Sequence, residues 1–137
     1  MLNIYYDWVN VVEKYYFCNM DIEQIRAYCL AKRGASESFP FDESTLVFKV
    51  GTKIFALLSL DADFSINLKC DPEKALELRE HYTEVIPGYH QNKKHWNTID
   101  LKGSLSKSLI CEWIDHSYKL VFSSLTKKEK DIIREHS

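Results

Sequence analysis

Apolar and polar residues alternate in the middle of the chain, as expected for strands with one buried and one solvated face. Residues 45–50 alternate in this way. Residues 53–60 form a return strand across the connection Gly51-Thr52, whose two residues suit a type II′ hairpin. After a turn at residues 61–63, residues 64–69 alternate again. The pattern predicts an antiparallel meander of three strands.

Two helices are predicted on either side of this meander from their capping residues. Asp21 is followed three positions on by Gln24, which has the form of a capping box and predicts a helix to about Lys32. Asp71 precedes Pro72, an arrangement typical of an N-cap with proline at the first helical position. This second helix is expected to run to about residue 81.

Two more helices are predicted in the last third of the chain, after a turn at Pro87-Gly88 and a strand at residues 97–101. Ser106 is the expected cap of the longer one, and Thr126 with Glu129 forms a second capping box. The longer helix is expected to cover the sheet, because its apolar residues recur at helical spacing. They are Leu109, Ile110, Trp113, Ile114, Ser117, Leu120 and Val121.

This order of elements predicts a two-layer α+β domain, with an antiparallel sheet covered by helices on one face. The domain is expected to span residues 20–137. Residues 1–19 carry aromatic and aliphatic residues at near-helical spacing and are interpreted as an N-terminal aromatic arm or helix. Such an arm would pack on the domain or on a second copy in a homodimer, or form a lid over a ligand. Alternatively, Met20 is the natural first residue of the protein.

Composition narrows the classes of function. The chain has 137 residues, a formal net charge of −2 and a pI near 6.2. Proteins that coat nucleic acid usually carry a basic excess, so any such role here must depend on a local patch. The four cysteines are widely separated and are interpreted as reduced thiols, which favours the cytoplasm. No run of eighteen apolar residues is present, so no membrane span is expected.

A basic, aromatic and amide-rich stretch over residues 85–100 is the main candidate site. For a polyanion such as DNA, lysines would neutralise phosphates, histidines and the asparagine amide would donate to phosphate oxygens, and an aromatic ring would stack on an unpaired base. The candidate binding residues are Tyr89, His90, Asn92, Lys93, Lys94, His95 and Trp96.

The same stretch also has a structural interpretation. Trp96 would then enter the core beside the long helix, His90 and Asn92 would satisfy backbone groups in an irregular loop, and the lysines would be solvated.

Catalysis and metal binding have little support in the sequence. Neither a recognisable nucleophile turn nor a glycine-rich phosphate loop is present. His90 and His95 lie five positions apart, which does not place two ligands on one helix face. Asp61 and Asp63 lack the other ligands of a calcium loop and are interpreted as turn formers. We therefore expect a non-enzymatic protein without a metal or cofactor.

Several segments resemble one family of small bacterial proteins. These are Phe39-Pro40-Phe41-Asp42, the hairpin at residues 46–57, Pro87-Gly88-Tyr89-His90 and His95-Trp96-Asn97-Thr98. Together they resemble the MmcQ/YjbR family over residues 20–133. The resemblance implies a double-wing fold similar to type III secretion chaperones and CyaY-like proteins, and it suggests DNA binding.

The expected function is therefore a binding module that takes DNA or another polyanion through its basic aromatic loop. The alternative is a protein-interaction or chaperone-like module that forms a homodimer and has no nucleic-acid role.

Overall fold

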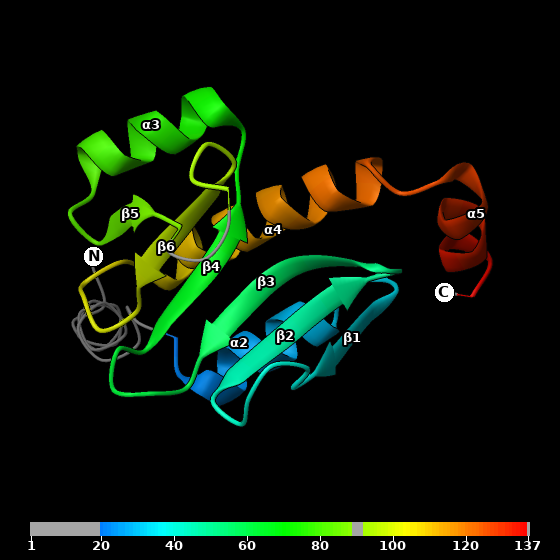
Figure 1. Cartoon of the computed structure of the whole chain (residues 1–137), viewed down its shortest axis with the longest axis horizontal. Coiled ribbons are helices and arrows are strands. Elements are labelled where there is room, and N and C mark those ends of the chain that lie inside the picture. The colour runs from blue at the N-terminus through cyan, green and yellow to red at the C-terminus, as the bar shows by residue number, and fades with distance from the viewer. Residues whose placement is uncertain (1–19, 89–91, 137) are drawn as a thin grey trace, which may run out of the picture.

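The computed structural model describes residues 20–88 and 92–136, and it has one antiparallel sheet of six strands (Figure 1). The order across the sheet is β1-β2-β3-β4-β6-β5, and every neighbouring pair is antiparallel. The strands are β1 (Ala35–Ser38), β2 (Thr45–Val50), β3 (Lys53–Ser59), β4 (Ser65–Lys69), β5 (Val85–Pro87) and β6 (Trp96–Asp100).

Helices cover one face of this sheet and leave the other face open toward the viewer of Figure 1. The described helices are α2 (Ile22–Leu30), α3 (Pro72–His81), α4 (Lys107–Ser123) and α5 (Lys127–Glu135). Helix α4 lies behind β3 and β4, α2 lies behind the β1–β2 side, and α3 contacts β5. The prediction of an α+β fold with helices on one face is confirmed.

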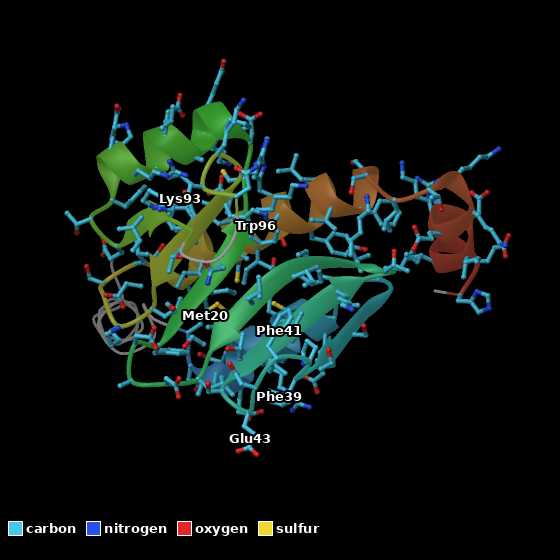
Figure 2. All side chains as sticks on the ribbon, viewed as in Figure 1. Met20, Phe39, Phe41, Glu43, Lys93 and Trp96 are labelled. Carbon is cyan, nitrogen blue, oxygen red and sulfur yellow. The ribbon has the colours of Figure 1, made fainter. Side chains whose placement is uncertain are left out.

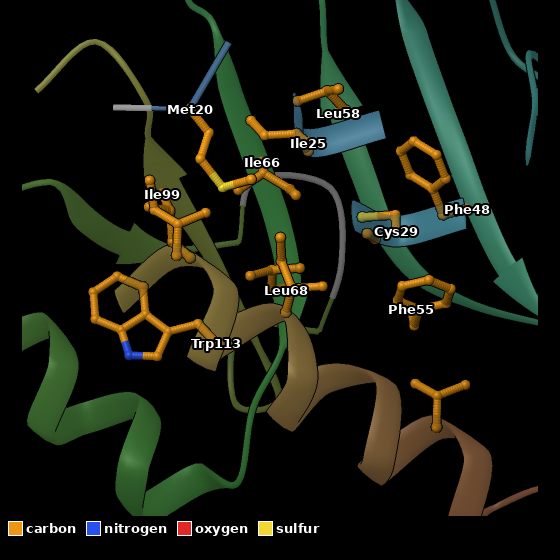
Figure 3. Packing of buried hydrophobic residues seen from close by; sticks show 14 of the residues in the cluster. Met20, Ile25, Cys29, Phe48, Phe55, Leu58, Ile66, Leu68, Ile99 and Trp113 are labelled. Atoms are coloured by element: carbon orange, nitrogen blue, oxygen red, sulfur yellow. The ribbon is translucent and has the colours of Figure 1, made fainter. Parts of the chain in front are cut away.

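The core forms between the helices and the inward side chains of the strands (Figure 3). Residues of the stripe predicted on α4 are buried there, including Ile110, Trp113, Ile114 and Val121. Met20 is 2% exposed and packs in the same core, so the described chain begins inside the domain. Because the helix-facing side chains of the strands fill this core, their alternating partners are left on the open face.

The predicted helix starts are present. Asp21 and Gln24 form a reciprocal capping box, as do Thr126 and Glu129. The Asp71 side chain accepts backbone N–H groups at the start of α3, and the Ser106 hydroxyl accepts the N–H of Leu109 at the start of α4. The first helix ends two residues earlier than expected, at Leu30.

The hairpin between β2 and β3 turns at Gly51-Thr52, as predicted. Gly51 has a φ of 58° and no described residue other than glycine has a positive φ, which fits a type II′ turn and excludes type I′. The register shifts by one residue next to Phe48, so that Phe55 and Ala56 are both fully buried.

Strands β3 and β4 pair only over part of their length, from Ala56 opposite Leu68 to Ser59 opposite Ser65. Beyond that point a side chain of α4 replaces the strand-to-strand bond. The fully buried Ser117 hydroxyl donates to the carbonyl of Phe55 at 2.6 Å and accepts the N–H of Lys69 at 2.9 Å. This hydroxyl joins the two strands where they diverge.

The structure departs from the predictions at one edge of the sheet. Residues 85–87, expected to lead into a turn, form the short edge strand β5; beside it the N–H of Gly88 donates to the carbonyl of Trp96, and the carbonyl of Glu84 accepts the N–H of Asp100. At the other edge, where the sequence allowed either an irregular path or a short strand over residues 35–41, residues 35–38 form the short strand β1. The predicted arm at residues 1–19 lies outside the described residues. Within the described chain, no helix is both long and apolar enough to cross a membrane.

Candidate functional site

The open face of the sheet carries the side chains that alternate with the core residues. On β4 these are Ser65, Asn67 and Lys69, and on β6 they are Trp96, Thr98 and Asp100. The two sets face each other pairwise, with Lys69 opposite Trp96 and Ser65 opposite Asp100. The Thr98 hydroxyl bonds the amide oxygen of Asn67 at 2.5 Å in the middle of the face.

The turn before β6 holds the lysines of the predicted site. The carbonyl of Asn92 accepts the N–H groups of His95 at 3.1 Å and Trp96 at 3.0 Å, and its side-chain oxygen accepts the N–H of Lys94 at 2.9 Å. These bonds fold residues 92–95 into a compact turn. As a result Lys93 and Lys94 are solvent-exposed.

Arg79 of α3 fixes this turn from the helix side of the sheet. Its guanidinium donates to the side-chain oxygen of Asn97 at 2.7 Å and to the backbone carbonyls of Lys93 and Trp96. Asn97 is 1% exposed and its amide donates to the carbonyl of Ala75. The arginine therefore positions the lysine-bearing turn rather than serving as a free cation.

The structure brings part of the predicted site together. Asn92, Lys93 and Lys94 are exposed, and His95 and Trp96 are half-buried. Within the structural interpretation, the placement of Trp96 in the core beside the long helix is wrong, whereas Asn92 does satisfy a backbone N–H group and Lys93 and Lys94 are solvent-exposed. Trp96 lies on the open face, and the tryptophan in the core is Trp113. Tyr89 and His90 lie outside the described residues.

A small cationic region is formed by Lys69 and Trp96 at this end of the open face together with Lys93 and Lys94 in the turn before β6, and it is called the basic corner below. Lys69 is the direct cross-strand neighbour of Trp96, where side chains come within about 5 Å at Cβ. Among the described residues, no carboxylate lies within ion-pair distance of these three lysines.

The opposite end of the open face is hollowed and acidic. This acidic hollow has a volume of about 1180 Å³ and extends from Trp96 to the turns beyond the other ends of the strands. Five carboxylates line it together with one cation, Lys102, whose ammonium group lies 3.1 Å from Asp100. The carboxylates are those of Asp42, Asp61, Asp63, Glu84 and Asp100.

The carboxylates of the acidic hollow are held by local hydrogen bonds. Asp42 accepts the N–H groups of Ser44 at 2.9 Å and Thr45 at 2.7 Å, and these bonds lower its pKa below the ordinary value. Asp63 accepts the hydroxyl of Ser59 at 3.0 Å. Both carboxylates are therefore held as turn anchors, as was predicted for Asp63, and they also face the acidic hollow.

The described residues offer neither a metal-binding cluster nor a reactive cysteine thiol. Among the described residues, no three His, Cys, Asp or Glu side chains are grouped so as to hold a metal ion. The cysteines in this part of the chain are free thiols, and burial raises the pKa of Cys29 to about 12 and that of Cys70 to about 11, which disfavours the nucleophilic thiolate.

Sequence reasoning missed the acidic hollow and the role of Arg79. The alternation of β4 and β6 indicated a solvated face, but the residues of the hollow come from segments as far apart as Asp42 and Lys102. Periodicity within a strand reports which side chains share a face, and it does not report which distant turns meet at one end of the sheet.

These features define an α+β domain with one helix-covered and one open sheet face. The chain belongs to the YjbR family, because the YjbR family model matches residues 30–120, a range that includes all six strands and most of α4.

Similar proteins agree with this assignment. Uncharacterized protein YbdF of Escherichia coli O157:H7 is 40% identical over 97 residues, which cover 70% of this chain and 80% of YbdF. Uncharacterized protein YjbR of Escherichia coli K12 is 34% identical over 115 residues, 83% of this chain and 98% of that protein.

A crystal structure of Deinococcus radiodurans protein DR2400, a DUF419 domain, superimposes with a TM-score of 0.77 at 37% identity and covers 85% of this chain and 88% of its own. A crystal structure of a Pseudomonas syringae protein superimposes with a TM-score of 0.65 at 29% identity, covering 74% and 99%.

Proposed function

We propose that this protein is a non-enzymatic binding module that binds single-stranded DNA through the basic corner. The observation that supports the proposal most directly is that Lys69 lies opposite Trp96, and Lys93 and Lys94 lie in the turn just before it, without a described carboxylate in ion-pair range of these lysines. Unpaired ammonium groups on an acidic protein favour a local anionic ligand, because phosphate contacts supply most of the affinity for nucleic acid.

The ring of Trp96 favours a single strand over a duplex. Trp96 is half-buried on the open face and reachable from the acidic hollow, so its ring is available to an unpaired base rather than to a base inside a helix. Stacking on an aromatic ring contributes about 1–3 kcal/mol per base and tolerates any base. Lys69, Lys93 and Lys94 would then contact the phosphates on either side of that base.

The same geometry limits the size of the contact. Three lysines release counterions from about three phosphates, so the logarithm of the association constant should fall with the logarithm of salt concentration with a slope of about −2. The carboxylates of the acidic hollow repel phosphate and confine the strand to the basic corner. The expected complex is weak and strongly salt-dependent.

The test is a fluorescence-anisotropy titration of a labelled twelve-nucleotide strand and its duplex at 20 and 150 mM salt. The variant Lys93→Ala/Lys94→Ala should weaken binding and reduce the salt slope by more than half. Its matched control is Lys127→Ala/Lys128→Ala, which removes two exposed lysines at the start of α5, at the other end of the molecule (Figure 1). The proposal fails if the strand does not bind at 20 mM salt, or if the control weakens binding equally.

A further inference from the structure

We propose that the acidic hollow is a second binding site, which takes a peptide segment of a partner protein carrying lysine or arginine next to large apolar residues. The hollow is lined by residues of β3, β4 and β6 among others. It lies on the face of the sheet that no described helix covers, which is turned toward the viewer in Figure 1. This site goes beyond the proposed binding of DNA, because it takes a ligand of opposite charge and shares only Trp96 with the basic corner.

The first argument is the uncompensated charge. Among the described residues, Lys102 is the one cation in the lining, and it pairs with Asp100. Asp42, Asp61, Asp63 and Glu84 therefore face the hollow without a described cation within 4 Å. Four carboxylates at one end of a concave surface raise the local concentration of cationic ligands.

The second argument is an unsatisfied buried hydroxyl. Ser65 lines the hollow and is only 7% exposed, yet its hydroxyl has no hydrogen bond to any described residue. Its strand neighbour across the sheet is Asp100. A buried hydroxyl usually has a partner, because leaving it without one costs free energy, so a ligand group that reaches the floor of the hollow would complete this site.

The third argument is the apolar part of the lining. Leu57, Ile54, Ile86 and Trp96 form apolar surface beside the carboxylates, and Phe41 stands at the rim with 66% of its side chain exposed. Figure 2 shows Phe41 in front of the β2–β3 side of the sheet, with Phe39, which is 51% exposed, beside it. Exposed aromatic residues next to a depression are typical of contact sites for large apolar side chains.

The size and layout of the hollow favour a peptide over a small ion or metabolite. Its volume of about 1180 Å³ exceeds the roughly 300–1,000 Å³ of ordinary small-molecule pockets. The carboxylates do not converge into a metal site among the described residues. Negative charges at one end of the hollow with apolar surface beside them match a chain that presents both cationic and apolar side chains.

The experiment uses the full chain and a labelled ten-residue peptide that alternates lysine and leucine. One control peptide has every lysine replaced by glutamate, and a second has every leucine replaced by serine. Binding is measured by anisotropy at 50 mM salt. We expect only the lysine-leucine peptide to bind well, because it alone satisfies both the charged and the apolar parts of the lining.

The protein variants locate the site. Asp61→Asn/Asp63→Asn should weaken the peptide about three- to tenfold, in keeping with the modest strength of exposed ion pairs. The matched control Glu73→Gln/Glu77→Gln removes two exposed carboxylates of α3 and should change the affinity less than twofold. Phe41→Ser should also weaken binding, whereas Lys93→Ala/Lys94→Ala should not.

Two results would overturn the proposal: equal binding of the peptide by the two carboxylate variants, or no binding of the lysine-leucine peptide to the full chain. The DNA titration of the Asp61→Asn/Asp63→Asn variant separates the two sites. If the protein does not bind the peptide but still binds DNA, only the second site is refuted. If it binds the peptide but not DNA, only the proposed function is refuted.

Discussion

The Ser117 hydroxyl should be one of the most important single polar groups for stability. The variant Ser117→Ala removes it with little change in volume and leaves two backbone groups without a partner, the carbonyl of Phe55 and the N–H of Lys69. Both lie where β3 and β4 have stopped pairing with each other, so neither strand can supply a replacement.

The size of the effect follows from those two groups. A buried polar group left unsatisfied costs about 1–3 kcal/mol. Two such groups, partly relieved by strand relaxation, predict a loss of about 2–4 kcal/mol in the free energy of unfolding. At a urea dependence of about 2 kcal/mol per molar, the unfolding midpoint should fall by about 1–2 M.

The assay is urea unfolding followed by circular dichroism, together with hydrogen exchange of the Lys69 amide. The matched control is Ser108→Ala, an exposed serine on the same helix, which should change stability by less than about 0.5 kcal/mol. If Ser117→Ala lost no more stability than the control and its Lys69 amide exchanged at the normal rate, the hydroxyl would not be what joins the two strands.

Two further predictions concern other polar contacts. The ring nitrogen Nε2 of His116 accepts the N–H of Asp71, and burial, followed by the charge of Lys74, lowers the pKa of His116. In the unfolded chain His116 takes up a proton near its ordinary pKa of about 6.5, so stability should fall as the pH drops below that value. The variant His116→Gln should flatten this decrease between pH 7.5 and 5 in urea titrations. An unchanged pH dependence would refute the assignment. Arg79→Met should release the turn that carries Lys93, lower stability by about 1–3 kcal/mol through the unsatisfied side-chain oxygen of Asn97, and weaken DNA binding in the anisotropy assay. Wild-type affinity in a folded Arg79→Met variant would show that the turn does not depend on Arg79.

The parts of the fold that depend on neighbouring residues could be predicted from the sequence. The capping pairs Asp21 with Gln24 and Thr126 with Glu129 act over three positions, and both formed as expected. The alternation in β4 also identified the buried and solvated sides correctly, since Ile66 and Leu68 are in the core. These predictions succeeded because hydrogen bonds and side-chain direction within one element follow from local backbone geometry.

The candidate site was predicted less completely because it depends on contacts between distant segments. The lysines of the basic corner were found as a run in the sequence, but Lys69 joins them only through the pairing of β4 with β6. Likewise, Asp61 and Asp63 were recognised as turn residues, and their role in the acidic hollow depends on strand order. Neither pairing nor strand order can be derived from the spacing of residues along one strand.

The two outer strands have a consequence for how copies of this protein meet in a concentrated solution. Both are short, with four residues in β1 and three in β5, and β5 ends on Pro87, which has no N–H to offer to an incoming chain. On β1, Glu37 forms an ion pair with Arg26 at the sheet margin. Such margins resist the growth of one sheet into the next, which protects a half-uncovered sheet from aggregation. A ligand would therefore meet side chains on the open face of the sheet rather than a strand edge, and it would have to match their charge and shape.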